Sequence, residues 1–433
     1  MQTTLSDPGR PMRVQSWPLL LARCSAVLAL AAVPISTAGV NLASALLLLF
    51  AACSPEAWRG LRKIRTTPTS IAAIVLFAVL ALSLLYTTAG MNEAVNFLLK
   101  YRKLLIFPVL FLVLRGEGSA KWGCAAIWAL FAALTLSMLL TYTNAFGWTS
   151  LGPMHDTQGP MSKPWVFKDH ISGGLMMAFL IWLSVALGQS MTKPASRPIW
   201  RWLLYLNALL ALVNVLFVLQ GRTGQVVALL YVAVFVVWQL LHLRSARAGR
   251  IRLVATLACV VACVGLAYFA FTSKESRLAD TTQEITSYED SNQVTSAGVR
   301  LEFYRRSVDL FAHRPVAGYG VGSVLPEFER LAKNQTGGRA VMAGNPHNEF
   351  LLMGVQLGVI GIALFLWLLV ALYRECRHVD PLARNVIYGY LLAFFAGCFA
   401  NSLLLNFTEG SLFVLLSGIL LYSRRVKPGA IAR

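Results

Sequence analysis

The stretch that decides the fold is residues 349–372, EFLLMGVQLGVIGIALFLWLLVAL, in which Glu349 is the only charged residue. An α-helix needs about 20 predominantly apolar residues to cross the hydrocarbon core of a bilayer. The chain as a whole is 57% hydrophobic and 13% charged, with a mean hydropathy of +0.63. These values are typical of membrane proteins and not of a water-soluble domain.

Apolar runs of similar length recur on both sides of this stretch. We therefore predict an all-α, polytopic membrane helix bundle with about twelve transmembrane helices and one long periplasmic loop that itself contains helices. The predicted helices cover residues 16–36, 39–54, 69–88, 98–115, 122–143, 171–189, 201–219, 224–242, 252–271, 349–372, 385–402 and 408–423.

The basic residues predict the orientation of the bundle. If the N-terminus is cytoplasmic, each predicted cytoplasmic loop carries Lys or Arg, as the positive-inside rule requires. An even number of spans then returns the C-terminus to the cytoplasm. The start of the chain resembles a signal peptide, but we expect an uncleaved first span. The chain divides into helices one to nine (1–271), a periplasmic region (272–348), and helices ten to twelve with a tail (349–433).

Net charge and cysteines exclude other classes of protein. The formal charge of +19 follows from basic cytoplasmic loops, and no recognition helix or aromatic-basic platform indicates nucleic acid. The seven cysteines contain no CxxC motif, so we expect neither a disulfide framework nor structural zinc. No HExxH motif or paired outer carboxylates indicate a metal, and we expect none.

The long periplasmic segment has two parts. Residues 272–296 are polar and acidic, and we expect a mobile stretch. Residues 298–312 carry an apolar stripe at helical spacing and predict an amphipathic helix at the outer mouth of the bundle. Arg300 and Arg305 flank that stripe, while Arg306 points away from it. The glycine-rich turn at 318–323 is similar to a phosphate-binding loop, but outside a strand–turn–helix unit this is weak support.

Two cationic features on the outer side indicate chemistry. Arg222 lies in a glycine-flanked turn between two apolar helices, where it is either a snorkelling side chain or a clamp for a phosphate or pyrophosphate group. Its position against the positive-inside rule favours the clamp. His347 follows Pro346, and we place it in the first turn of a helix, as a general base or as an interfacial residue without a role.

Further outer residues are weaker candidates for binding a substrate such as a phosphate or pyrophosphate group. They are solvated charges or helix-capping residues in the simpler interpretation, and converged near Arg222 they would form an anion site. These candidates are Arg305, Lys168, His170, Lys100, Arg102, Lys103 and Asn348.

Four short motifs together resemble the bacterial O-antigen ligase and O-antigen polymerase superfamily. They are Arg-Leu-Glu-Phe-Tyr at 300–304, Pro-Val-Ala-Gly-Tyr-Gly-Val-Gly-Ser at 315–323, His-Asn-Glu-Phe-Leu-Leu at 347–352 and Gly-Val-Ile-Gly at 358–361. The Gly-Arg-Thr-Gly turn at 221–224 is similar to that family's outward arginine turn. Elsewhere the similarity is limited to the number of spans and the placement of loops.

The resemblance implies a glycosyltransferase that takes a glycan (O-antigen) from undecaprenyl pyrophosphate and transfers it to lipid A–core at the periplasmic face of the bacterial inner membrane. It implies that Arg222 and Arg300 hold the pyrophosphate and that His347 activates the acceptor hydroxyl. The family is thought to act without metal or other cofactor and with inversion.

Three alternatives remain open at this point. The polymerase of the same superfamily joins repeat units on the lipid carrier, and the local motifs do not separate it from the ligase. A protein-glycosylating ligase is a third branch. A transporter of lipid-linked glycans would instead place charges or broken helices near the membrane midplane. Sugar identity and oligomeric state are not predictable from these residues.

Overall fold

The computed structural model describes residues 16–116, 118–153, 164–191, 198–243 and 280–424, with four isolated residues between 261 and 268. The described part of the chain is all-helical and has no strand, which confirms the predicted class. Large apolar side chains such as Leu42, Leu82 and Trp202 lie exposed on its helices. Such a surface suits contact with lipid.

The helices fall into two groups. Those of the bundle are α1 (Trp17–Ala32), α2 (Thr37–Ala52), α3 (Pro55–Trp58), α4 (Pro68–Leu82), α5 (Met91–Leu99), α6 (Ile106–Leu114), α7 (Ala120–Ala145), α8 (His170–Ser190), α9 (Pro198–Val213), α10 (Arg222–Leu243), α15 (Glu349–Glu375), α16 (Pro381–Gly397) and α17 (Phe407–Ser423). The intervening segment forms α12 (Asp280–Ser291), α13 (Ser296–His313) and α14 (Val324–Ala332). Short 3-10 or π segments are η1 (Leu61–Thr66), η2 (Ser83–Leu85), η3 (Arg102–Leu105), η4 (Asn214–Leu219), η5 (Gly337–Ala340) and η6 (Cys376–His378).

Six described helical stretches are long and apolar enough to cross a membrane. They are Pro68–Leu85, Ala120–Ala145, His170–Ser190, Ile199–Leu219, Arg222–Gln239 and Glu349–His378. Three shorter apolar helices, α1, α2 and α17, accompany them. The number twelve thus stays a prediction, and the predicted helix at 252–271 lies almost entirely outside the described residues.

Several predicted elements differ from those observed. The single helix at 98–115 is divided into α5, η3 and α6, because the charges of residues 100–103 interrupt the apolar run. The helix at 385–402 ends at Gly397, and residues 398–406 form an irregular segment. Of the polar stretch 272–296, residues 272–279 lie outside the described part, and α12 covers residues 280–291; the expected mobility stays a prediction.

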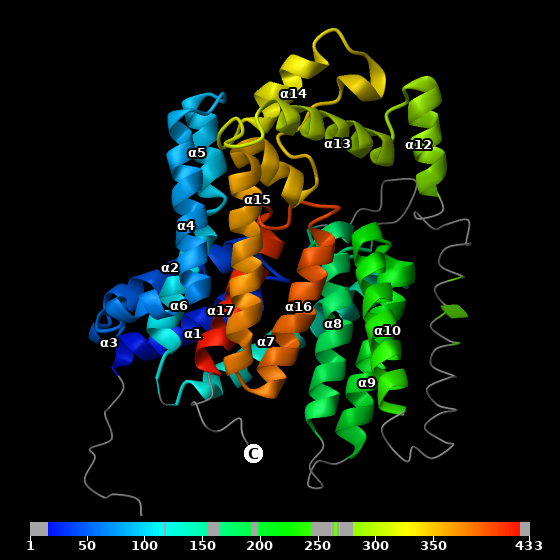
Figure 1. Ribbon diagram of the computed structural model, residues 1–433. Coiled ribbons are helices and arrows are strands. Elements are labelled where there is room, and N and C mark those ends of the chain that lie inside the picture. The colour runs from blue at the N-terminus through cyan, green and yellow to red at the C-terminus, as the bar shows by residue number, and fades with distance from the viewer. Residues whose placement is uncertain are drawn as a thin grey trace, which may run out of the picture.

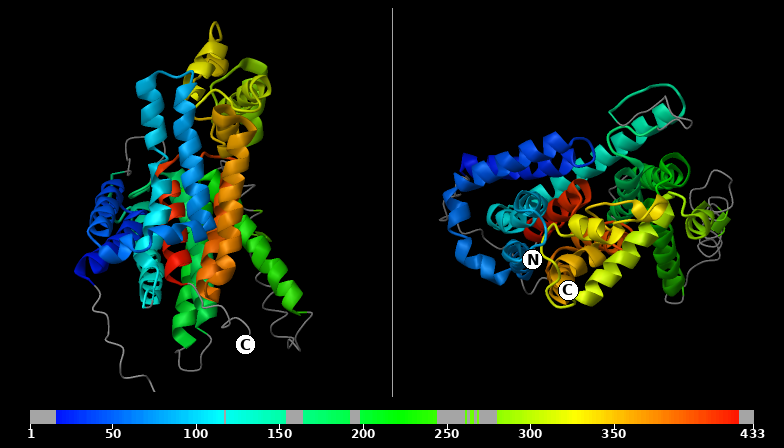
Figure 2. Two further views of the ribbon diagram at one scale, coloured as in Figure 1. Left: turned by 60° about the vertical axis from the view of Figure 1, so that its left-hand side comes forward. Right: turned by 90° about the horizontal axis from the view of Figure 1, so that it is seen from above.

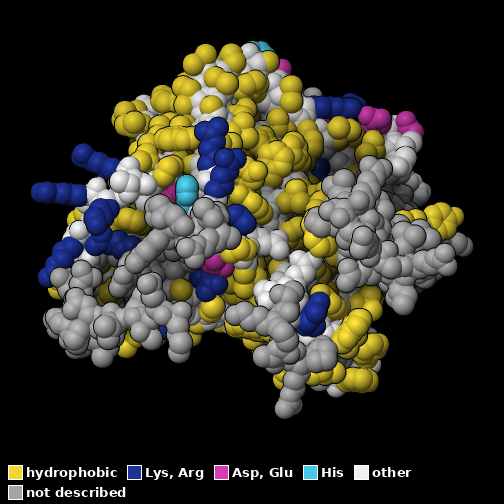
Figure 3. Space-filling view, turned by 60° about the horizontal axis from the view of Figure 1, so that its bottom comes forward, with side chains coloured by type: hydrophobic (Ala, Val, Ile, Leu, Met, Phe, Trp, Pro, Cys, Tyr) yellow, Lys and Arg dark blue, Asp and Glu magenta, His cyan; other side chains and the backbone are white. Residues whose placement is uncertain are grey.

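The bundle has two distinct ends. Figures 1 and 2 show α12, α13 and α14 lying over one end, which we call the capped end. At the opposite end, Arg424 after α17 pairs with Asp380 before α16 at 2.5 Å. Figure 3 turns this opposite end toward the viewer and shows Lys and Arg side chains spread over it. Exposed basic residues in the connecting segments and the last turn of α15 at this end include Arg59, Arg62, Lys63, Arg65, Arg374 and Arg377.

The glycine-rich turn at 318–322 joins the capped end to the bundle. Gly318, Gly320 and Gly322 have positive φ, a conformation that glycine adopts without steric cost. The amides of Tyr319 and Gly320 donate to carbonyls of α15 at 2.9 and 2.8 Å. Those of residues 321 and 322 donate to the side chains of Ser83 and Gln356. The turn therefore uses its N–H groups within the fold, and its similarity to a phosphate-binding loop is superficial.

Candidate active site

Arg222 is the first residue of α10 and follows a turn in which Gln220 has a φ of 51°. A Cβ added to Gly221 would lie 2.1 Å from the carbonyl oxygen of His170, and one added to Gly224 would lie 2.5 Å from the backbone of Gly174. The two glycines thus allow close packing of the turn against α8, as small residues do in membrane bundles. This packing places Arg222 beside the start of α8 at the capped end.

Arg300 projects from the first half of α13 into the same region. Burial lowers the pKa of its guanidinium, the positive charge of Arg222 lowers it further, and Glu284 raises it. Arg300 therefore lies within electrostatic range of both residues. Within the described part of the chain its guanidinium donates no hydrogen bond. Two guanidinium groups thus share one half-buried region, which is a strong attractor for a multiply charged anion.

His347 is the third predicted residue that reaches this region. Burial and the charge of Arg300 lower the pKa of its imidazole to about 4, so the ring is neutral near pH 7. Its ring lies nearly parallel to that of Phe303, at 6.3 Å between centroids. Neither ring nitrogen forms a hydrogen bond with the described residues, so both remain available to a substrate.

The local structure around His347 corrects one prediction. His347 has a φ of 56°, and its amide donates to Asn345 Oδ1 at 2.9 Å. Asn348 is the N-cap of α15, because its Oδ1 accepts from the amides of Phe350 and Leu351. His347 therefore precedes the helix instead of lying in its first turn. The Asn348 side chain caps the helix and donates from Nδ2 to the carbonyl of Phe399 at 3.0 Å.

The irregular segment 398–406 connects the arginine turn to the histidine loop. Asn401 Nδ2 donates to Thr223 Oγ1, next to Arg222, at 2.8 Å. Two residues earlier, the Phe399 carbonyl accepts a 2.9 Å hydrogen bond from the hydroxyl of Tyr304 on α13. The same hydroxyl donates to the carbonyl of His347 at 3.2 Å. One segment thus holds the two halves of the site in a fixed relation.

Two buried ionisable side chains, Glu349 and Lys103, form hydrogen bonds with the backbone of segment 398–406. Glu349 Oε2 accepts from the amides of Leu404 and Leu405 at 2.8 and 3.3 Å. Lys103 Nζ donates to the carbonyls of Leu405 and Asn406 at 3.1 and 2.5 Å. Lys103 is only 6% exposed. The structure therefore places it as a support for segment 398–406 and not on the outer surface.

The other candidate cations are distributed around the site. Lys100 and Arg102 are exposed, and the Lys100 ammonium lies 4.9 Å from the centre of the Phe97 ring. Lys168 Nζ donates to Thr37 Oγ1 at 3.1 Å. His170 stacks on Trp165 at 4.6 Å and adjoins the arginine turn through its carbonyl. The backbone of His170 thus packs against the turn that carries Arg222.

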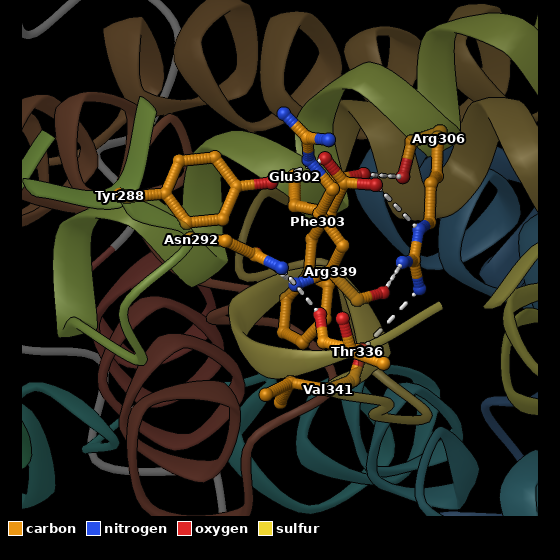
Figure 4. A network of polar contacts seen from close by, with 9 residues as sticks. Tyr288, Asn292, Glu302, Phe303, Arg306, Thr336, Arg339 and Val341 are labelled. Carbon is orange, nitrogen blue, oxygen red and sulfur yellow. Dashed lines mark hydrogen bonds and ion pairs between the residues drawn. The ribbon is translucent and has the colours of Figure 1, made fainter. Parts of the chain in front are cut away.

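The environments of Arg305 and Arg306 differ from the prediction: Arg305 is exposed and Arg306 is buried. Arg305 pairs with Glu289 at 2.7 Å, and both side chains are about half exposed. Arg306, expected to point away from the apolar face, is only 4% exposed. It donates to Glu302 at 3.0 Å and to the carbonyls of Arg339 and Val341 (Figure 4). The segment that contains Arg339 and Val341 covers the face of α13 from which Arg306 projects. The prediction for Arg306 considered the α13 sequence alone, so it could not take this segment into account.

Sequence reasoning missed three residues of the site. Tyr304 ends the motif at 300–304 but was not proposed as a site residue, although its hydroxyl joins two backbone segments. Asn401 was placed at the end of a predicted helix, where the adjacent Asn-Ser pair was a signal that the helix had already ended. Glu284 was placed in a mobile stretch. It forms an ion pair with Arg222, and a second hydrogen bond joins Arg222 Nη1 to Glu284 Oε2 at 3.2 Å.

The chemistry of this region rests on two guanidinium groups and one neutral imidazole. Guanidinium groups bind phosphate oxygens through paired hydrogen bonds, and a neutral imidazole accepts a proton. Among the residues that the structure describes, no three His, Cys, Asp or Glu side chains are grouped in a way that could hold a metal ion.

The comparison with known protein families points to the part of the chain that carries the candidate site. No curated protein matches the chain. Residues 207–366 match the sequence model of a family described as O-antigen ligase. This segment runs from α9 to the middle of α15 and contains Arg222, Arg300 and His347 together. The match confirms the resemblance of the chain to the O-antigen ligase and polymerase superfamily.

Proposed function

We propose that this protein is a membrane glycosyltransferase that transfers a glycan from undecaprenyl pyrophosphate to lipid A–core at the periplasmic face of the bacterial inner membrane. The observation that carries the proposal is the grouping of Arg222, Arg300 and His347 at one end of the bundle, within the segment that matches the O-antigen ligase family. The basic side chains on the opposite end support a periplasmic capped end under the positive-inside rule.

In this proposal Arg222 and Arg300 bind the diphosphate of the donor. As the glycosidic bond breaks, negative charge develops on the leaving diphosphate, and the guanidinium groups stabilise it. His347 accepts the proton of the acceptor hydroxyl as that oxygen attacks the anomeric carbon from the opposite face, which gives inversion. The proposed transfer needs no metal or other cofactor, which is what the resemblance implies.

The negative charge of the bound donor also changes the pKa of His347. Arg300 is the second cause of the lowered pKa of His347. A bound diphosphate offsets that charge, so the pKa of His347 rises when the donor is in place. The imidazole thus becomes a stronger base in the donor complex than in the free enzyme.

The first test replaces His347 by Ala in a deletion strain. We expect loss of glycan-capped lipopolysaccharide, because removal of a general base costs roughly 10²–10⁴-fold in rate. His313→Ala is the matched control, since His313 is exposed and pairs with Asp309 on its own helix. Normal capping by the His347→Ala strain, at wild-type levels of inserted protein, would contradict the proposal.

The glycans found in the deletion strain itself distinguish a ligase from a polymerase. Deletion of a ligase leaves long glycan chains on the lipid carrier, whereas deletion of a polymerase leaves single repeat units on lipid A–core. Purified protein in detergent should also form the glycan–acceptor product, since there is then no membrane to cross. A transporter would form none.

A further inference from the structure

Glu284 on α12 occupies the guanidinium of Arg222. Its two carboxylate oxygens accept hydrogen bonds from Arg222 Nη1 and Nη2. Glu284 Oε2 also accepts from the amide of Ala297, at the start of α13, at 2.8 Å. One carboxylate is therefore bound by a guanidinium fork and by a helix N-terminus at once.

These donors form a site for an oxyanion. Guanidinium binds carboxylate and phosphate with the same planar pair of hydrogen bonds. Free amides at a helix N-terminus favour either anion. Arg300 lies within electrostatic range of both Arg222 and Glu284. The carboxylate of Glu284 thus sits where a phosphate oxygen would meet the same donors, and it removes one of the two positive charges from the region.

Glu284 can leave this position while α12 stays in place. Farther along the same helix, the Tyr288 hydroxyl donates to Glu302 on α13 at 2.6 Å. Asn292 Nδ2 donates to the Thr336 carbonyl at 2.7 Å (Figure 4). The side chains of Arg222 and Glu284 are 20% and 23% exposed, so solvent reaches the pair. Rotation of the Glu284 side chain therefore suffices to separate its carboxylate from the Arg222 guanidinium and the Ala297 amide.

We propose that Glu284 is an internal competitor for the diphosphate of the lipid carrier. It holds Arg222 in the unliganded protein, yields it when the donor diphosphate binds, and takes it back as the lipid diphosphate product leaves. The inference rests on the proposed function, in which Arg222 binds that diphosphate. Its consequence is a weaker affinity for diphosphates, which favours product release and turnover.

Binding of inorganic pyrophosphate and of undecaprenyl pyrophosphate to the purified full chain in detergent tests the proposal. Glu284→Gln keeps the shape of the side chain and removes its charge. We expect at least threefold tighter binding of both probes, because the competing anion is gone. Glu289→Gln is the matched control on the same helix, since it removes a half-exposed partner of Arg305, and its affinity should equal that of the wild type.

The outcomes separate this inference from the proposed function. If Glu284 serves only to fasten α12, Glu284→Gln lowers the thermal midpoint and leaves both affinities unchanged or weaker, which would overturn the inference. Glu284→Ala is measured in parallel, and it too should bind tighter. If Arg222→Ala binds both probes as well as the wild type, the assignment of the diphosphate to Arg222 fails instead.

Discussion

Two glycine-rich turns at the capped end look alike in sequence and do different things. The turn at 221–224 and the turn at 318–322 both pack their glycines closely against neighbouring backbone. The second turn uses its amides in hydrogen bonds to α15 and to the side chains of Ser83 and Gln356. The first presents Arg222 to an anion, at present the carboxylate of Glu284. Glycine spacing thus indicates close packing, and the charged side chain between the glycines indicates the site.

Among the effects that this comparison of the two turns predicts, the largest comes from removing the charged side chain of Arg222. Arg222→Ala should lower kcat/KM for glycan transfer about 10²–10³-fold, the usual cost of losing one donor to a developing negative charge. Arg222→Lys should recover only part of this, because an ammonium lacks the planar fork. Transfer by purified protein is the measurement. Arg305→Ala should stay close to wild type, and a comparable loss there would show that net charge, not position, governs binding.

The second turn should respond through stability and not through substrate affinity. Gly320→Ala places a Cβ 2.4 Å from Thr87 Cα at a φ of 87°. We expect a loss of roughly 2–4 kcal/mol from left-handed strain and overpacking. The thermal midpoint in detergent measures it. Gly90→Ala, whose Cβ would meet only Glu93 at 3.9 Å, is the control. A raised KM with an unchanged midpoint would give this turn a role in binding.

The smallest effect is a displacement along the pH axis. The pKa of free His347 is lowered to about 4, and its neutral form is the active one. Activity should therefore hold as the pH falls through 6.5, the ordinary value for histidine, and decline only toward pH 4. Because kcat/KM reports the free enzyme and kcat the complex, the acid limb of kcat should lie at higher pH. If the acid limbs of kcat and kcat/KM coincided, donor binding would not change the pKa of His347 through the charge of Arg300.

Much of this architecture follows from hydropathy and charge. Runs such as 349–372 are apolar enough to predict their helices, and α13 follows from its stripe. The break within 98–115 was missed because averaged hydropathy conceals three closely spaced cations. Among these, Lys103 binds carbonyls that are 302 and 303 residues away in sequence. No local pattern contains such a partner.

The site was predictable as a set of residues but not as an arrangement. Arg222, Arg300 and His347 stand out by charge and by motif, and the structure brings Arg300 within electrostatic range of both Arg222 and His347. The connecting residues did not stand out, because Tyr304, Asn401 and Glu284 matter through single contacts with distant segments. Such contacts depend on tertiary packing that a single sequence does not reveal.

The position of segment 398–406 has a consequence for chimeric proteins. It lies outside the matched stretch 207–366, yet its Asn401 binds beside Arg222 and its Phe399 carbonyl binds Tyr304. A graft that moves only the matched stretch into another scaffold would carry the reactive groups without the brace that aligns them. Exchanges between relatives should therefore transplant the link between α16 and α17 as well.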